Sequence, residues 1–362
     1  MMRTIVCVIG TRPEAIKMTP VVRALKAMPG VRCVVIATAQ HRDMLDQMLF
    51  RFRIVPDHDL NLMADGQTSL SLLAHMLPAL GEVFTREKPD AVLAQGDTTT
   101  VFGAALCAFH LHIPFGHIEA GLRTNDLEHP FPEEGYRQMV SRTARWHLAP
   151  TMGASQALLG EGIAEDHIHV TGNTCIDALL QTIDEIPSAL EEANRSILLT
   201  VHRRESFGAP LADIFSAVKI IAERFPDVQF IYPVHPNPNV RKSAYEILSN
   251  HPRIRLCEPL DYFDFVDLMR RSTLILTDSG GVQEEAPALG KPVLVLRDTT
   301  ERPEAIACGS SRLLGTNAEC IVEGVSALLE QPDLLAKMSQ VRYPYGDGKA
   351  AQRILDVLME TL

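Results

Sequence analysis

The chain has 362 residues, of which 46% are hydrophobic and 22% charged, and its formal net charge at pH 7 is −11. This composition excludes a short disulfide-stapled module and a disordered chain, and the length suits about two domains. The acidic balance argues against a nucleic-acid partner, whose phosphates attract basic surfaces.

The sequence also argues against a membrane protein. No apolar run approaches the roughly 20 residues that a spanning helix needs. The first residues, MMRTIVCVIG, pass directly into strand-like sequence and lack the basic region ahead of a long apolar stretch that is typical of a secretory leader. The seven cysteines are scattered and form no CxxC pair. We therefore expect free thiols and a cytoplasmic location.

Short apolar runs that end in polar or glycine-containing turns recur along the chain. Continuous runs of this kind are typical of strands buried on both faces of a parallel sheet. Stretches with helical spacing lie between them, such as 15–28 and 211–225. The alternation predicts an α/β architecture with parallel sheets. The expected strands lie at 5–10, 33–40, 91–97, 115–121, 167–173, 197–205, 228–235, 274–281 and 292–298.

The strand pattern pauses after Asn173 at a helical stretch and restarts at Ile197. We therefore expect two similar domains, residues 1–170 and 171–351, with a C-terminal helix at about 352–362 that joins the first domain. In such folds, ligands bind beyond the carboxyl ends of the strands. The active site is therefore expected in the cleft between the domains.

The segment GTRPEAIK, which starts at Gly10, directly follows the first expected strand. Gly10 allows a tight turn, the next helix would point backbone N–H groups at an anion, and Arg12 and Lys17 could hold a phosphate. An ordinary capped helix start with solvated charges explains the motif equally well. The segment is not GxGxxG, so it does not indicate a nicotinamide cofactor.

A second glycine-containing segment, DSGGVQEEAP, follows the strand at 274–281. The small residues Ser279, Gly280 and Gly281 would let the backbone approach a diphosphate, and Glu285 could accept hydrogen bonds from a ribose. Pro287 falls inside the expected helix, where it removes a backbone donor. A nucleotide site is favoured over a plain strand–turn–helix joint, which also uses glycine.

Acidic side chains follow strands of the first domain at Asp97 and Glu119, and Glu133 lies in its long loop. An Asp before TTT is commonly a helix cap, but three carboxylates in one cleft would have different pKa values and supply both a base and an acid. His202 follows the first strand of the second domain and, taken alone, is equally well structural. No clustered ligands indicate a metal site.

Eleven segments, read in order, closely resemble the bacterial non-hydrolysing UDP-N-acetylglucosamine 2-epimerases over nearly the whole chain. The resemblance implies two Rossmann-like domains of the GT-B type, usually as a homodimer, and interconversion of UDP-GlcNAc and UDP-ManNAc without a cofactor. The segments are GTRPEAIKM, TAQHRDMLDQ, QGDTTT, GHIEAGLRT, PEEGYRQ, TGNTCIDAL, HRRESFG, YPVHPNPNVR, LTDSGGVQEEAP, GKPVLVLRDTTERPEA and PYGDGKA.

The resemblance also implies roles for single residues. The family route is anti elimination of UDP to 2-acetamidoglucal and syn re-addition, which supplies precursors of cell-surface polysaccharide. The positions associated with catalysis are Asp97, Glu119, Glu133 and His202. The positions that contact UDP are Arg12, Lys17, Arg302, Ser279, Gly280 and Gly281, with Glu285 at the ribose and Phe265 and the backbone near Leu260 at the uracil.

Bacterial relatives can bind a second UDP-GlcNAc as an activator. Gln40, Glu133, Arg203 and His235 match that second site, whereas Asp43 and Gly66 stand where some members have Gln and Arg. Loss of an Arg removes a phosphate contact, so activation by substrate is expected to be weakened.

Three other functions stay open from the sequence. A sister epimerase that acts on a UDP-diacetamido-uronic acid shares the GTRPE and SGG motifs. A GT-B glycosyltransferase shares the fold, but the paired acidic and HRRE segments argue against it. A sensor that only binds sugar nucleotides would not need the acidic residues and His202 together.

Overall fold

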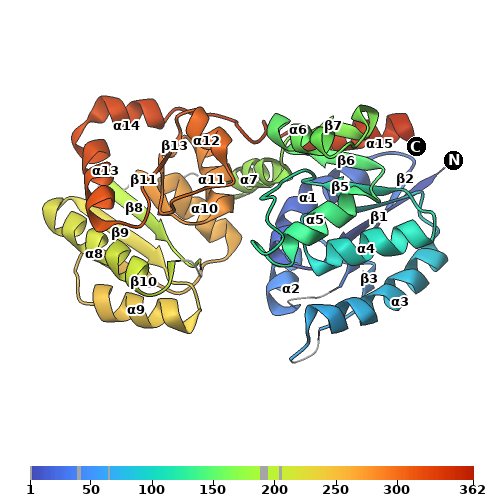
Figure 1. The fold of residues 1–362 in the computed structure, drawn as a ribbon, viewed down its shortest axis with the longest axis horizontal. Coiled ribbons are helices and arrows are strands. Elements are labelled where there is room, and N and C mark those ends of the chain that lie inside the picture. The colour runs from blue at the N-terminus through green and yellow to red at the C-terminus, as the bar shows by residue number, and fades with distance from the viewer. Residues whose placement is uncertain (1, 39–41, 64–65, 188–194, 204–205) are drawn as a thin grey trace. The chain divides into compact units, whose positions relative to one another are not determined.

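The computed structural model describes residues 2–38, 42–63, 66–187, 195–203 and 206–362. The chain divides into two compact units: unit 1 is Met1–Ala178 with Tyr345–Leu362, and unit 2 is Leu179–Pro344. Each unit is a parallel sheet with helices on its faces (Figure 1). The expectation of an α/β fold with two parallel sheets is confirmed.

The sheet of unit 1 has the strand order β3-β2-β1-β4-β5-β6-β7, and every neighbouring pair is parallel. The order reverses between β1 and β4. In folds with this strand order, ligands bind at the carboxyl edge of the sheet, beside the loops that follow these two strands. The strands are β1 (Arg3–Ile9), β2 (Val31–Ala37), β3 (His58–Asp59), β4 (Ala91–Gln95), β5 (Phe115–Ile118), β6 (Trp146–Ala149) and β7 (Ile168–Val170).

The C-terminal helix returns to unit 1, where it packs on α1 (Figure 1). Asp177 of α7 accepts the N–H groups of Ala350 and Ala351 at 3.2 and 2.8 Å, and so caps this helix. Residues 171–178 and 345–351, which the sequence assigned to the second domain, therefore lie in unit 1. The helices that begin in unit 1 are α1 (Arg12–Ala27), α2 (Arg42–Arg51), α3 (Ser69–Glu87), α4 (Thr99–His110), α5 (Glu133–Ser141), α6 (Met152–Gly160), α7 (Thr174–Glu185) and α15 (Ala350–Thr361).

The parallel sheet of unit 2 has the order β10-β9-β8-β11-β12-β13, which reverses between β8 and β11. Its strands are β8 (Arg195–Thr200), β9 (Val228–Pro233), β10 (Ile254–Cys257), β11 (Leu274–Thr277), β12 (Val293–Val295) and β13 (Ser311–Leu313). Its helices are α8 (Ala209–Arg224), α9 (Pro238–Leu248), α10 (Tyr262–Arg271), α11 (Gly280–Glu285), α12 (Pro303–Ala307), α13 (Ala318–Glu330) and α14 (Pro332–Met338).

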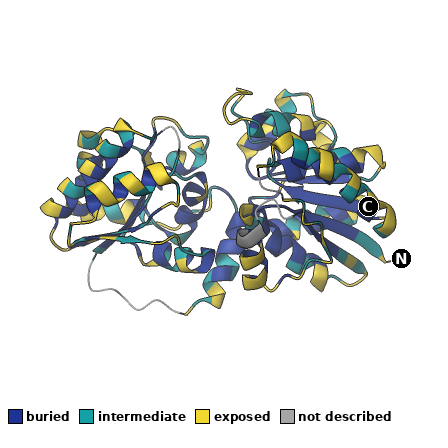
Figure 2. Ribbon diagram, turned by 90° about the horizontal axis from the view of Figure 1, so that it is seen from below, coloured by how far each residue is buried: buried dark blue, intermediate teal, exposed yellow. Residues whose placement is uncertain are grey.

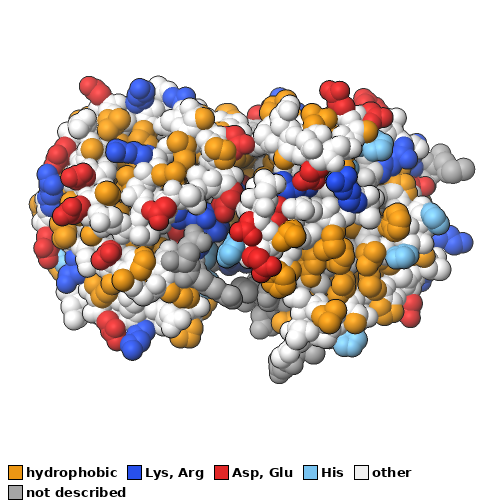
Figure 3. Space-filling view, viewed as in Figure 1, with side chains coloured by type: hydrophobic (Ala, Val, Ile, Leu, Met, Phe, Trp, Pro, Cys, Tyr) orange, Lys and Arg blue, Asp and Glu red, His pale blue; other side chains and the backbone are white. Residues whose placement is uncertain are grey.

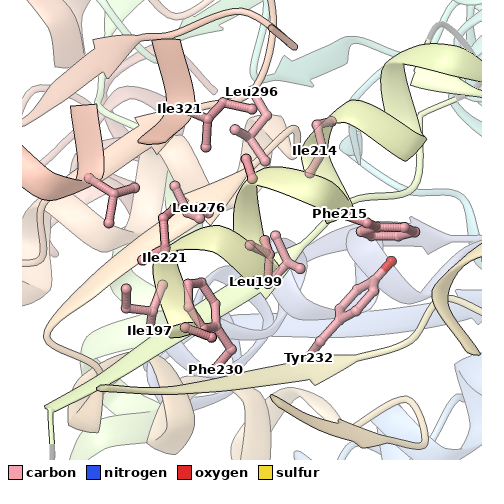
Figure 4. Packing of buried hydrophobic residues seen from close by; sticks show 14 of the residues in the cluster. Ile197, Leu199, Ile214, Phe215, Ile221, Phe230, Tyr232, Leu276, Leu296 and Ile321 are labelled. Atoms are coloured by element: carbon pink, nitrogen blue, oxygen red, sulfur yellow. The ribbon is translucent and has the colours of Figure 1, made fainter. Parts of the chain in front are cut away.

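Burial follows the apolar runs of the sequence, because the central strands are covered on both faces (Figure 2). In unit 2, Leu199 of β8 and Leu276 of β11 pack with Ile214 and Ile221 of α8, and all four are fully buried (Figure 4). The expected helix at 211–225 is confirmed as α8. Among the described helices, none combines the length and apolar character needed to cross a membrane.

Four strands were not expected from the sequence: β3, β6, β10 and β13. They are two to four residues long, and each contains a charged residue or a histidine, so none forms a continuous apolar run. Strand β6 also contains His147, a polar residue that is buried because its two ring nitrogens contact the carbonyls of Ser141 and His167. The position of Pro287 is also explained: α11 ends at Glu285, and the proline is the second residue of a separate 3₁₀ turn, Ala286–Leu289.

His117 of β5 connects stability to pH. Its Nε2 donates to the Gly96 carbonyl at 2.7 Å, and burial lowers the pKa of His117 to about 4. In the unfolded chain, a histidine takes up its proton near pH 6.5, well before His117 does in the folded protein. The free energy of unfolding therefore decreases as the pH falls from about 6.5 to about 4.

We expect His117→Gln, which keeps an N–H donor for Gly96, to reduce this acid sensitivity. The variant should be less stable than the parent at pH 7, and the difference should shrink by about 2 kcal/mol at pH 4.5. Thermal unfolding across this range measures it, with the exposed His110→Gln as control. A constant difference between parent and variant would contradict the assignment.

Candidate active site

Residues proposed for catalysis and phosphate binding follow three adjacent strands of unit 1. Arg12 and Lys17 lie on α1 after β1, Asp97 follows β4, and Glu119 follows β5. Since β1, β4 and β5 are neighbours in the parallel sheet, their carboxyl ends bring these residues to the same edge as the strand-order reversal.

The GTRPEAIK segment is a capped helix start. Thr11 and Glu14 form a reciprocal capping box at the beginning of α1, and Arg12 is exposed. Gly10 is required by packing, because a Cβ there would lie 2.0 Å from Thr100 Oγ1. The helix start is capped as that explanation expects, but Lys17 is not a solvated charge because it pairs with Glu119, and Arg12 stays accessible to a ligand.

Glu119 lies among hydrogen-bond donors. Lys17 Nζ is 2.5 Å from its Oε1, Asn173 Nδ2 donates to the same oxygen at 2.8 Å, and Gln95 Nε2 donates to Oε2. Glu119 is only 9% exposed, and its φ of +66° is in the left-handed region. A charged group, two amides and an unusual backbone conformation thus hold one carboxylate.

Asp97 is not a helix cap, so that interpretation is wrong. Thr98 caps α4 instead, accepting the N–H of Val101. Asp97 Oδ2 accepts Arg137 Nε and Nη2 at 2.9 and 2.7 Å, and Arg137 Nη1 reaches Glu134 at 3.1 Å. Arg137 therefore fixes Asp97 across 40 residues of sequence.

Glu133 and Glu134 differ sharply in their surroundings. Glu134 is fully buried and accepts hydrogen bonds from Gln138 and the N–H groups of Thr124 and Asn125. Burial alone would raise the pKa of Glu134, but these donors and Arg137 hold it below its usual range. Glu133 is half-buried in the first turn of α5. The structure thus gives Glu134 a scaffold role and leaves Glu133 as the proposed reacting group.

In unit 2, the proposed UDP-binding residues lie at the ends of β11 and β12. The Arg302 guanidinium lies over this loop: a Cβ built at Gly280 would be 3.4 Å from it, in ordinary van der Waals contact. Arg302 Nε donates to Glu284 Oε1 at 2.7 Å, and the hydroxyl of Tyr262 donates to Glu285 Oε1 at 2.7 Å.

Ser279 and Gly281 flank Gly280 at the start of α11. The proposed uracil contacts lie on a separate element of unit 2: Phe265 is half-buried on α10, and Leu260 is half-buried just before that helix.

His202 follows β8 and is oriented by Asp278, which follows β11. Asp278 is fully buried, its Oδ2 accepts the N–H groups of His202 and Arg203 at 2.8 Å each, and its Oδ1 is 3.2 Å from His202 Nδ1. Burial alone would raise the pKa of Asp278, but the interactions with His202 hold it below its usual range. His235 stacks on His202 with ring centroids 5.2 Å apart. The structure thus orients the imidazole of His202.

The residues of the expected activator site lie in both units. Arg203 and His235 are near His202 in unit 2. Gly66 is exposed in unit 1, with a φ of +70° and no atom within 4 Å of where a Cβ would stand. Gln40 and the side chain of Asp43 lie outside the described residues.

Sequence reasoning missed several side chains that hold the proposed groups. All except Tyr262 lie in the quoted segments, and Tyr262 lies between the expected uracil positions Leu260 and Phe265, but none of these side chains has a distinctive signal by itself. They are Gln95, Arg137, Asn173, Tyr262, Asp278 and Glu284. Across the described part of the chain, no three His, Cys, Asp or Glu side chains are grouped in a way that could hold a metal ion.

Comparison with known proteins assigns the family. The family model described as UDP-N-acetylglucosamine 2-epimerase matches residues 23–359. This chain belongs to the UDP-N-acetylglucosamine 2-epimerase family. The enzymes of that name from Escherichia coli K12 and Bacillus subtilis 168 are 48% and 50% identical to it, each over 98% of this chain, and the matches cover 98% and 94% of those enzymes. The chain is therefore an isomerase of this family.

Solved structures agree with the family assignment. The UDP-GlcNAc 2-epimerase from Neisseria meningitidis, solved bound to UDP-GlcNAc, has a TM-score of 0.93 and 44% identity, over 99% of this chain and 100% of that one. A glycosyltransferase of kitacinnamycin with 12% identity still has a TM-score of 0.68, so the likeness shows the shared GT-B-like fold alone.

We expect the kcat of the epimerase to depend on the orientation of His202 by Asp278. We expect Asp278→Asn to lower kcat by at least about tenfold with little change in KM, because an amide cannot accept two backbone N–H groups and also hold the same imidazole tautomer. Steady-state kinetics measure this effect. Tyr232→Phe is the control, because it removes only the hydrogen bond to the Val201 carbonyl. Equal losses of kcat in both variants would argue against orientation of His202.

Proposed function

We propose that this enzyme interconverts UDP-GlcNAc and UDP-ManNAc at carbon 2, through elimination and re-addition of UDP. The observation that carries the proposal is the placement of Asp97 and Glu119 at adjacent strand ends, each against a cation, in a chain of the epimerase family. The meningococcal structure described with UDP-GlcNAc bound supports the same substrate.

In the elimination step, a carboxylate takes the hydrogen of carbon 2. The C–H electron pair forms the C1–C2 double bond while the bond between carbon 1 and the UDP oxygen breaks, which releases UDP and leaves 2-acetamidoglucal. Positive charge that develops at carbon 1 makes the hydrogen on carbon 2 more acidic. Arg12, Lys17 and Arg302 would stabilise the departing diphosphate electrostatically.

In the re-addition step, a diphosphate oxygen bonds to carbon 1 and carbon 2 receives a proton on its opposite face. Two groups on different faces are needed, and Asp97, Glu119, Glu133 and His202 are the proposed proton-transfer groups. The cycle involves no net oxidation, so we propose that it requires no cofactor. Ser279, Gly281, Glu285, Leu260 and Phe265 would hold the nucleotide in the proposed binding mode.

The choice between substrates rests on sugar chemistry. A UDP-diacetamido-uronic acid would need a cationic group for its extra carboxylate. Measuring the turnover of UDP-GlcNAc and of the uronic acid with the same enzyme preparation distinguishes these two substrates. We further propose that the product supplies ManNAc-type precursors for cell-surface polysaccharide.

We propose that the enzyme acts as a homodimer in the cytoplasm. The seven cysteines are free thiols, as expected in a reducing compartment. Hydrophobic side chains gather over α3 and α4 of unit 1 (Figure 3), where Leu70 and Phe109 are 76% and 56% exposed. An exposed apolar area of this kind is typical of a surface that binds another protein.

We also propose that activation by a second UDP-GlcNAc is weakened. Gly66 offers no side chain to a ligand, whereas Arg203 and His235 retain groups that could contact one. Coupling between two sites is usually about 1–3 kcal/mol, so loss of one Arg contact could remove much of it.

Exchange of hydrogen with solvent tests the elimination. Because the proton is removed and delivered by different groups, we expect UDP-sugar recovered from heavy water to carry deuterium at carbon 2, in reactions without added metal or nicotinamide. NMR of the sugar ring measures this. Epimerisation that retains the original hydrogen would rule out the proposed route.

Calorimetric titration with UDP tests the nucleotide site of unit 2. We expect Arg302→Ala and Glu285→Ala to weaken UDP binding by at least about tenfold, since each removes a partner of the bound nucleotide. Arg312→Ala, an exposed change on β13, is the matched control. Unchanged affinity in both variants would mean that UDP binds elsewhere.

A further inference from the structure

The backbone at Glu119 is held in a conformation that L residues seldom adopt. Its φ is +66°, directly after β5, and the N–H groups of Glu119 and Ala120 both donate to the carbonyl of Leu148, at 3.0 and 3.2 Å. Such a conformation persists only where surrounding structure over-determines it, and it is concentrated at functional sites. The direction of this one side chain is therefore built into the fold.

Two neutral amides, which neither the motifs nor the resemblance assigned, complete the surroundings of this carboxylate. Gln95, the last residue of β4, donates to Oε2, and Asn173, which directly precedes α7, donates to Oε1 at 2.8 Å. Both are nearly fully buried, with exposed fractions of 3% and 2%. Buried amides satisfied in this way form hydrogen bonds of fixed geometry.

The orientation of the Asn173 amide follows from its other contacts. Its Oδ1 accepts the N–H of Cys175 at 3.1 Å, and its backbone N–H donates to the Tyr345 carbonyl at 2.6 Å. With the oxygen end of the amide committed to Cys175, the NH₂ end must face Glu119. An amide nitrogen is a donor only, so it favours the ionised carboxylate.

The third donor, Lys17, has a different character. Its ammonium is 2.5 Å from Glu119 Oε1, and it is also a proposed contact of the diphosphate. An ammonium on a flexible stem can turn toward an arriving phosphate. Asn173 donates to the same oxygen and Gln95 to the other, so both oxygens of Glu119 keep a donor when Lys17 turns.

We propose that Gln95 and Asn173 are positioning residues for the epimerisation, acting through Glu119, whose carboxylate they hold in one orientation while Lys17 engages the diphosphate. This inference rests on the proposed function, in which Glu119 transfers a proton at carbon 2. The two amides do not touch the substrate themselves, and they set the direction from which the carboxylate meets carbon 2.

Two substitutions remove the donors with little other change. Gln95→Met keeps the length of the side chain without its N–H groups. Asn173→Ser keeps an oxygen that can accept the N–H of Cys175 but cannot reach Glu119. Asn317→Ser is the matched control, because Asn317 caps α13 in unit 2 in the same way, accepting from Glu319 and Cys320.

We expect Gln95→Met and Asn173→Ser each to lower kcat by about tenfold or more, because small misplacement of a reacting group has effects of this size. KM and the calorimetric affinity for UDP should stay within about twofold, and Asn317→Ser should keep the parent kcat. Melting temperatures of the three variants, compared with the parent, identify any that fold poorly.

A second background separates positioning from structural damage. In Glu119→Gln, the further change Gln95→Met or Asn173→Ser should lower the residual kcat little, because the group through which both act is already altered. A full additional loss in that background, or an unchanged kcat in the parent background, would overturn the inference. Failure of the parent enzyme to turn over UDP-GlcNAc would instead refute the proposed function.

Discussion

The edge of unit 1 that carries the proposed chemistry depends on one buried carboxyl group, that of Glu14. Its Oε2 accepts the N–H groups of Gly10 and Thr11 at 2.6 and 3.3 Å, and its Oε1 accepts the hydroxyl of Thr98 at 2.6 Å. Glu14 therefore ties the loop after β1 to the loop after β4, where Asp97 lies. Burial raises the pKa of Glu14 to about 7, although these hydrogen bonds act in the opposite direction. Loss of one donor would therefore leave a buried carboxyl oxygen without its hydrogen bond, which destabilises the fold.

Two of the proposed ligand-binding charges, Arg302 and Lys17, are each paired with a carboxylate of their own unit. Arg302 pairs with Glu284 in unit 2, and Lys17 pairs with Glu119 in unit 1. Paired side chains lose less conformational freedom when a ligand binds, which favours affinity, but the diphosphate must then compete with an existing carboxylate partner.

The sequence predicted the central strands because a continuous apolar run reflects a strand that is buried on both faces. It predicted α1 and α8 because apolar residues at helical spacing reflect a helix that is buried on one face. It also predicted where polar groups gather, since parallel strands end at one edge. It could not predict Gln95 or Asn173 as partners of Glu119: they lie 24 and 54 residues from it in the chain, and only the fold brings them together. For Asp97, the local sequence was misleading: its position before three threonines predicted a helix cap. In the structure, its carboxylate pairs instead with Arg137, which is distant in the sequence.

Asp97 and Glu119 are both carboxylates at neighbouring strand ends, but they differ in what holds them. Arg137 grips Asp97 with two nitrogens and also binds Glu134, so this cation belongs to the scaffold. The cation at Glu119 is Lys17, which the proposed mechanism shares with the diphosphate. In that mechanism, the charge near Glu119 would change when substrate binds, whereas the charge near Asp97 would not. A neutral donor attracts a phosphate less strongly than an ammonium does. Neutral donors can therefore keep holding Glu119 when the diphosphate binds, and the two amides beside Glu119 are donors of this kind.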